Sequence, residues 1–120
     1  MVKRYTKNPV GAHYGLGAWL LQRLTAVVMA VYTIGFLACI LWHVPSNQAD
    51  WKAIFGGGVG RLATIIFFAA LLYHAWVGMR DILMDYVKAT GLRLALQMAV
   101  ALALIAYLVW AASILWGVKP

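Results

Sequence analysis

The sequence has no glutamate, one cysteine and only 11% charged residues, yet 65% of its 120 residues are hydrophobic. A soluble domain of this length could not bury so much apolar surface. The single Cys39 cannot form an intramolecular disulfide, and no cysteine cluster is present to hold an iron–sulfur centre. The net charge of +7 does not indicate nucleic-acid binding, because the basic residues mostly flank apolar runs, as topology signals do.

Three uncharged runs account for the excess of apolar residues: Leu24–Trp42, Leu62–Met79 and Leu94–Val118. Each is close to the ~20 residues with which a helix crosses a bilayer. The sequence therefore predicts an all-α integral membrane protein with three transmembrane helices.

The basic residues predict the orientation of these helices. Seven lie on the side of the N-terminus and the second connection: Lys3, Arg4, Lys7, Arg23, Arg80, Lys88 and Arg93. Three lie on the other side: Lys52, Arg61 and Lys119. Because basic residues concentrate on the cytoplasmic side, this distribution predicts the N-terminus inside and the C-terminus outside.

The expected segments follow from the apolar runs and from the prolines and glycines between them. We expect a cytoplasmic tail at 1–17, irregular or interfacial because of Pro9 and its glycines, and a loop rich in glycine outside the membrane. The full set is tail 1–17, transmembrane helix 18–43, periplasmic loop 44–59, transmembrane helix 60–87, cytoplasmic turn 88–91, transmembrane helix 92–117 and a short end 118–120.

His74 is the one histidine within the uncharged run Leu62–Met79. An ionisable group inside a membrane is costly unless it has a partner, so it is a functional-site hypothesis by default. The imidazole could hydrogen-bond to another helix, bind a metal such as haem iron, or belong to a proton path. One central histidine cannot provide bis-histidine coordination, so a haem here would need its other ligand from a second subunit or copy.

Polar residues follow His74 along one stripe of the expected helix. His74, Gly78, Asp81 and Asp85 recur at steps of three and four, and Ala70 borders them, leaving room for a broad, flat group. Gly78 is equally consistent with close approach of a neighbouring helix.

The cluster from Arg80 to Lys88 is typical of a juxtamembrane interface, with Tyr86 as an aromatic anchor. It could also serve a lipid-soluble carbonyl compound, with a phenol donating a hydrogen bond and a carboxylate relaying protons. Arg23 likewise has two interpretations: it could extend toward the interface, or it could pair with an anionic group such as a haem propionate. His13 and His43 lie outside this pattern and are interpreted as structural.

The run from His74 to Lys88, HAWVGMRDILMDYVK, followed by Leu92-Arg93-Leu94, resembles the hydrophobic membrane anchor subunit of bacterial succinate dehydrogenase. Arg23-Leu24-Thr25-Ala26 and the three-span architecture fit the same family. The resemblance is strong over the second span and the turn, and weak elsewhere.

The resemblance implies a role for each matching residue. His74 corresponds to an axial ligand of haem b, Tyr86 to a tyrosine that hydrogen-bonds ubiquinone, and Asp85 to a carboxylate near that site. Arg23 corresponds to an arginine near the haem propionates. Twelve residues separate His74 from Tyr86, about 18 Å along a helix.

The resemblance further implies a subunit that is not catalytic alone, in the inner membrane of a bacterium. Its partners would be a second anchor subunit (cytochrome b556) that shares the haem, an iron–sulfur subunit, a flavoprotein subunit and membrane lipids. The alternatives are the anchor of a quinol:fumarate reductase and a structural membrane subunit without a cofactor. A small channel or transporter subunit is disfavoured, because the third span offers only Gln97 and Ser113 as polar residues.

Overall fold

A computed structural model describes the backbone of residues 10–119 and the side chains of residues 16–119. Within this part the secondary structure is entirely helical: α1 (Val10–Trp42), α2 (Gln48–Gly56), α3 (Gly58–Tyr86) and α4 (Thr90–Gly117). The stretches Leu16–Trp42, Gly58–Tyr86 and Thr90–Gly117 are long and apolar enough to cross a membrane. The prediction of an all-α protein with three membrane spans is confirmed.

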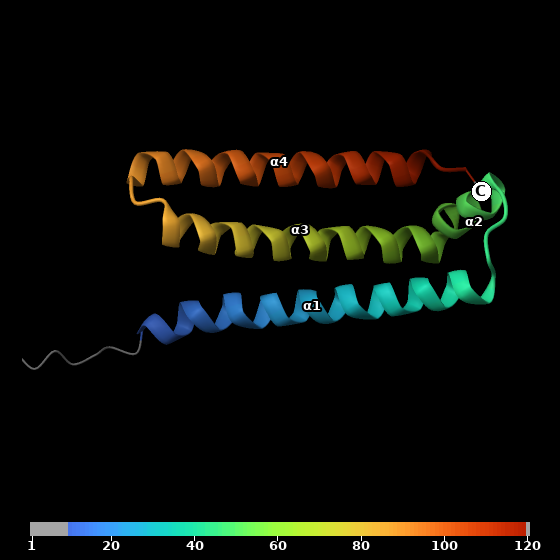
Figure 1. The fold of residues 1–120 in the computed structure, drawn as a ribbon, viewed down its shortest axis with the longest axis horizontal. Coiled ribbons are helices and arrows are strands. Elements are labelled where there is room, and N and C mark those ends of the chain that lie inside the picture. The colour runs from blue at the N-terminus through green and yellow to red at the C-terminus, as the bar shows by residue number, and fades with distance from the viewer. Residues whose placement is uncertain (1–9, 120) are drawn as a thin grey trace, which may run out of the picture.

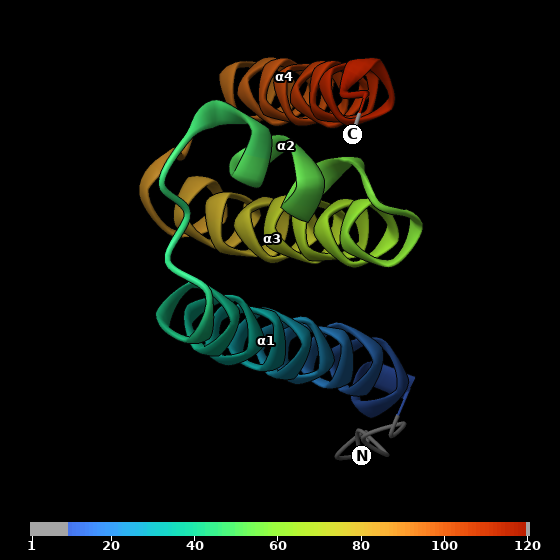
Figure 2. The ribbon, with the colours of Figure 1, turned by 90° about the vertical axis from the view of Figure 1, so that its right-hand side faces the viewer.

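The three long helices lie antiparallel in a single row, with α3 in the middle (Figure 1). α3 packs against α1 on one side and against α4 on the other, and the described parts of α1 and α4 make no contact with each other. Viewed along the helix axes, with α2 nearest the viewer, α2 lies across the ends of α3 and α4 (Figure 2). We call this the α2 end; the opposite end, where α1 begins and α3 ends, is the Tyr86 end.

A flat row buries few side chains. The buried hydrophobic residues are Ala70, Val77 and Leu83 in the central helix and Leu115 in α4. Large apolar side chains are exposed along all three long helices, as expected for surfaces that meet lipid tails or other membrane helices. The central helix therefore holds most of the small core.

Helix α1 begins at Val10, inside the segment 1–17 that the sequence analysis expected to be irregular. Residues 1–9 of that tail lie outside the described part. The three glycines between positions 11 and 17 do not prevent the helix, because a glycine costs only about 1 kcal/mol relative to alanine and is common in membrane helices. The helix thus begins at Val10, and the candidate membrane span within it begins at Leu16.

The expected loop 44–59 contains a helix, α2, which the sequence analysis missed. Asn47 caps it: its side-chain oxygen accepts a hydrogen bond from the Asp50 amide at 2.9 Å. The Asp50 carboxylate in turn accepts bonds from the Ser46 amide and hydroxyl at 2.9 and 3.0 Å. This reciprocal arrangement resembles a capping box, and the Asn47–Asp50 spacing was the signal available in the sequence.

The glycine run after α2 forms a tight junction rather than a flexible loop. Gly57 is at once the C-cap of α2 and the N-cap of α3. A Cβ at Gly60 would collide with the Ile54 carbonyl, because α2 folds back over the first turn of α3. Arg61 adds a tie by donating from Nη2 to the Gly56 carbonyl at 3.2 Å and the Val118 carbonyl at 3.1 Å, which links α2, α3 and the end of α4.

Candidate functional site

His74 lies on the face of α3 that packs against α1, and two polar side chains of α1 contact its ring. Thr25 Oγ1 lies 3.2 Å from His74 Nδ1, and Gln22 Nε2 lies 3.4 Å from His74 Nε2. The residues that contact each other are 49 and 52 positions apart in the sequence. The partner of this intramembrane histidine within the chain is therefore a pair of residues one helical turn apart on α1.

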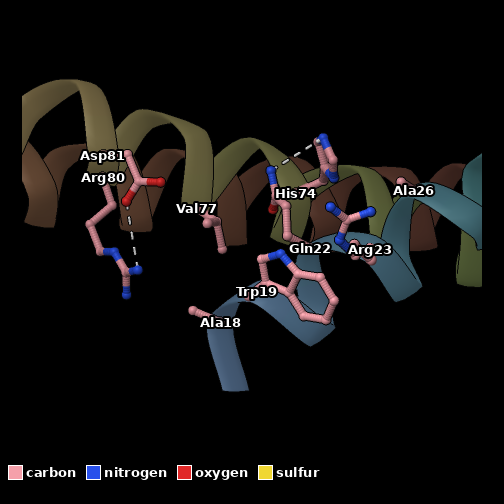
Figure 3. A pocket seen from close by; sticks show the side chains of 9 residues that line it. All are labelled: Ala18, Trp19, Gln22, Arg23, Ala26, His74, Val77, Arg80 and Asp81. Carbon is pink, nitrogen blue, oxygen red and sulfur yellow. Dashed lines mark hydrogen bonds and ion pairs between the residues drawn. The ribbon is translucent and has the colours of Figure 1, made fainter. Parts of the chain in front are cut away.

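A cavity of about 540 Å³ lies beside the histidine, between α1 and α3. Figure 3 shows Gln22, Trp19 and Arg23 on α1 across from His74 on α3, with Arg80 and Asp81 further along α3. The lining residues are Ala18, Trp19, Gln22, Arg23, Ala26, His74, Val77, Arg80 and Asp81. Trp19, Arg23 and Asp81 are exposed, so the cavity opens at the surface of the chain.

The charged groups of the cavity are mostly cationic. Arg23 stacks over the Trp19 ring, with its guanidinium carbon 4.3 Å from the ring centroid. Arg80 approaches Asp81 at 3.7 Å, a loose ion pair, and its Nε is buried without a hydrogen-bond partner in the described part of the chain. Gln22 Oε1 is also buried there without a partner. The cavity thus carries one unused donor, Arg80 Nε, and one unused acceptor, Gln22 Oε1.

The structure brings some of the predicted site residues together and not others. His74 and Arg23 line the same cavity, and so does Asp81 of the polar stripe. Tyr86 is the last residue of α3 and is 80% exposed. Tyr86 and its neighbour Asp85, which is also exposed, do not line the cavity that contains His74. A Cβ added at Gly78 would meet no atom within 4 Å, so this glycine is not a point of close helix approach within the chain.

Sequence reasoning missed Gln22, Thr25, Trp19 and Arg80 as residues of this site. Gln22 and Thr25 are polar positions near the start of an apolar span, which is a signal, although nothing in the sequence paired them with His74. His43 lies at the far end of α1, in a separate cavity of about 630 Å³ that also includes Trp42 and Asp50. Among the described residues, no group of three or more His, Cys, Asp or Glu side chains could hold a metal ion by itself.

The fold and the site define a multi-pass membrane protein with a histidine-bearing cavity between two of its spans. A family model described as "Succinate dehydrogenase/Fumarate reductase transmembrane subunit" matches residues 5–110. The chain belongs to this family of transmembrane subunits.

Two curated relatives carry the name "Succinate dehydrogenase hydrophobic membrane anchor subunit". The protein from Coxiella burnetii (strain RSA 493 / Nine Mile phase I) is 38% identical over 102 residues, which cover 85% of this chain and 89% of that protein. The protein from Rickettsia bellii (strain RML369-C) is 32% identical over 98 residues, covering 80% of this chain and 77% of that protein. The resemblance inferred from the sequence is confirmed.

Proposed function

We propose that this chain is the membrane-anchor subunit of a succinate:ubiquinone oxidoreductase and that His74 supplies one axial ligand to a haem b. The observation that carries the haem assignment is the His74 ring, held by α1 on one side and bordered by an open cavity with two arginines. The names of the relatives support the anchor role and favour succinate oxidation over fumarate reduction. The cofactor-free structural subunit is the competing proposal.

The residues around the cavity fit a flat macrocycle with anionic substituents. Ala18 and Ala26 leave space on the α1 side, and the His74 ring offers a nitrogen ligand. Arg23 and Arg80 could each pair with a carboxylate, since guanidinium binds carboxylate well. A bound haem b would supply reversible one-electron chemistry in the membrane.

His74 can supply only one of the two axial ligands. Of the histidines with described side chains, the other is His43, which is 21 residues beyond Gln22 on α1, or about 31 Å along the helix axis. We propose that the second ligand comes from a companion anchor subunit packed against the open side of the cavity. The exposed positions of Trp19 and Arg23 would place them at that interface.

We assign the Tyr86 end to quinone reduction. Among the described residues, this end carries Arg23, Arg80, Lys88 and Arg93, while the α2 end carries Lys52, Arg61 and Lys119. The Tyr86 end is therefore the more basic of the two and would face the cytoplasm. The exposed phenol of Tyr86 would donate a hydrogen bond to a ubiquinone carbonyl, and Asp85 would give protons access from the water side. The flavin and iron–sulfur chemistry would belong to two peripheral subunits docked at this end.

The haem assignment is tested by purifying the complex with His74→Ala and recording its reduced-minus-oxidised spectrum. We expect the low-spin b-type signal to be lost or converted to high spin, because one axial ligand is gone. His43→Ala is the matched control, since it removes a histidine of the same chain at the opposite end. An unaltered spectrum in His74→Ala would overturn the assignment.

The quinone assignment is tested with Tyr86→Phe, which removes only the phenol oxygen. We expect quinone reduction to slow about tenfold, the effect of losing roughly 1.4 kcal/mol of hydrogen bonding in the transition state. Succinate oxidation by an artificial soluble acceptor should stay unchanged. Tyr107→Phe, at an exposed position of α4, is the control. Equal losses in both assays would indicate an assembly defect and contradict the quinone role.

A further inference from the structure

Thr25 is one of two buried polar residues of the described chain, the other being Thr64. The residue is 9% exposed, and its hydroxyl makes two contacts: to the Gln22 carbonyl at 2.9 Å and to His74 Nδ1 at 3.2 Å. Because neither water nor lipid competes for a buried hydroxyl, both contacts have to be accounted for as hydrogen bonds.

Counting protons fixes the direction of both bonds. A threonine hydroxyl has one proton to donate and two lone pairs to accept with. A carbonyl can only accept, so the Thr25 hydroxyl donates to the Gln22 carbonyl. The contact with His74 must then run the other way, with Nδ1–H donating to Thr25 Oγ1.

This direction determines the tautomer of His74. A neutral imidazole carries a single N–H, so a proton on Nδ1 leaves Nε2 with a lone pair. Gln22 is consistent with this, because its amide nitrogen lies 3.4 Å from Nε2 and can donate to it, while its Oε1 has no partner. His74 Nε2 is therefore the nitrogen with a free electron pair, and it faces Gln22, which lines the cavity.

We propose that Thr25 is a positioning residue for His74, whose hydroxyl holds the imidazole in its Nδ1–H tautomer and keeps Nε2 as the ligand nitrogen. The inference deepens the proposed function, because it concerns the histidine assigned there to haem b. Outer-shell partners of this kind orient a metal-binding histidine and raise its basicity, and losing one typically costs about 10–100-fold in metal affinity or activity. The Gln22 amide contacts the lone pair of His74 Nε2 when no ligand is bound, and a haem iron would displace it.

Three variants of α1 separate this role from a merely structural one. Thr25→Val keeps the shape of the side chain but removes the hydroxyl, and Thr25→Ser restores the hydroxyl. Thr33→Val is the matched control: Thr33 makes the same kind of intrahelical bond, to the Met29 carbonyl at 2.7 Å, but it is exposed and makes no bond to another helix. If the complex with Thr25→Val does not assemble, Thr25→Ala, which also removes the hydroxyl and has a smaller side chain, should give the same results.

The first readout needs no haem. Solid-state ¹⁵N NMR of histidine-labelled full chain in lipid bilayers reports which nitrogen of His74 is protonated, with the other two histidines replaced for assignment. We expect Nδ1–H in the unaltered chain, Thr25→Ser and Thr33→Val. In Thr25→Val the ring should shift toward Nε2–H, because Gln22 Oε1 is then an available acceptor and Nδ1 has none.

The second readout uses the intact complex. Transfer of haem to apomyoglobin should be about tenfold or more faster in Thr25→Val, following the second-shell effect on affinity. The midpoint potential of the haem should rise, because a less basic ligand stabilises the ferric state less. Thr25→Ser and Thr33→Val should match the unaltered complex in both measurements.

Two outcomes separate the failure of this inference from that of the proposed function. Thr25→Val with an unchanged tautomer and unchanged haem transfer, in a complex where His74→Ala loses the signal, would overturn the role of Thr25 alone. Retention of the haem signal in His74→Ala would overturn the haem assignment, while the NMR result would still decide whether Thr25 sets the tautomer.

Discussion

In the described part of the chain, two polar contacts join α1 to α3, and they differ in whether every polar atom has a hydrogen-bond partner. Toward the α2 end, the Tyr32 and Thr64 hydroxyls lie 2.8 Å apart, and Thr64 also donates to the Gly60 carbonyl at 2.7 Å. Because the Thr64 hydroxyl already donates to the Gly60 carbonyl, the Tyr32 hydroxyl donates to Thr64. Both hydroxyl protons of the pair are therefore in hydrogen bonds. Toward the Tyr86 end, the contact of His74 with Thr25 and Gln22 leaves an acceptor unpartnered beside a cavity.

The packing around the two contacts differs in the same sense. The Tyr32 ring is stacked on Phe67, with centroids 4.5 Å apart, and on Phe36, with centroids 5.9 Å apart. No comparable aromatic cluster encloses the His74 ring in the described chain, where Ala18 and Ala26 line open space instead. A contact whose polar atoms are all hydrogen-bonded and enclosed by aromatic rings holds two helices together. A contact with an unpartnered polar atom beside small residues is suited to accept a further group.

The largest expected effect comes from closing the open contact. Ala26→Trp places a bulky side chain in the cavity and leaves His74 itself unmutated. Overpacking of this kind costs about 1–3 kcal/mol. Because the tryptophan and the haem would occupy the same space, the haem should be bound at least about fivefold more weakly. The b-type signal of the purified complex should therefore fall strongly. Ala38→Trp, at an exposed position of the same helix, is the control. A full signal in Ala26→Trp would mean that the cavity is not where the haem lies.

A smaller effect is expected from opening the saturated contact. In a double-mutant cycle of Tyr32→Phe and Thr64→Val, the coupling in the free energy of unfolding should be about 0.6 kcal/mol and at most about 1.7, as for other hydrogen bonds between membrane helices. The cycle can be measured by unfolding the chain in bicelles. The haem spectrum should not change in any of these variants. Loss of the b-type signal in Tyr32→Phe would remove the distinction between the two contacts.

The smallest effect concerns the α2 end, through the cap of α2. Bonds from the Ser46 amide, and then the Ser46 hydroxyl, lower the pKa of Asp50 below its ordinary value. The ionised Asp50 carboxylate therefore stabilises the start of α2 fully above the pKa of an unfolded aspartate, about 3.9. This stabilisation is lost as the pH falls through the lower pKa of the folded state. We expect α2 amides to exchange slightly faster in Asp50→Asn at neutral pH, with Ser113→Ala as an unrelated polar control. Identical exchange in the two variants would contradict the capping role.

The sequence predicted the features that depend on single residues or on local runs. His74 was identifiable because an ionisable side chain in an apolar span is rare. Arg23 lines the same cavity, and its pairing with a haem propionate stays a prediction. The pairing of His74 with Thr25 and Gln22 was not predictable, because it depends on which face of α1 turns toward α3. Helix α2 was missed for another reason: its nine residues lie among glycines, and only the Asn47–Asp50 cap indicated it.

By itself the sequence determined that this chain crosses a membrane three times, and which histidine lies inside a span. Hydropathy and chain length decide these points, because the cost of exposing polar backbone or side chains to lipid applies to each segment separately. Only the tertiary structure decided what His74 contacts and which of the two polar contacts remains open. Those properties depend on the rotation of each helix about its axis, and that rotation is fixed by packing between segments far apart in the sequence.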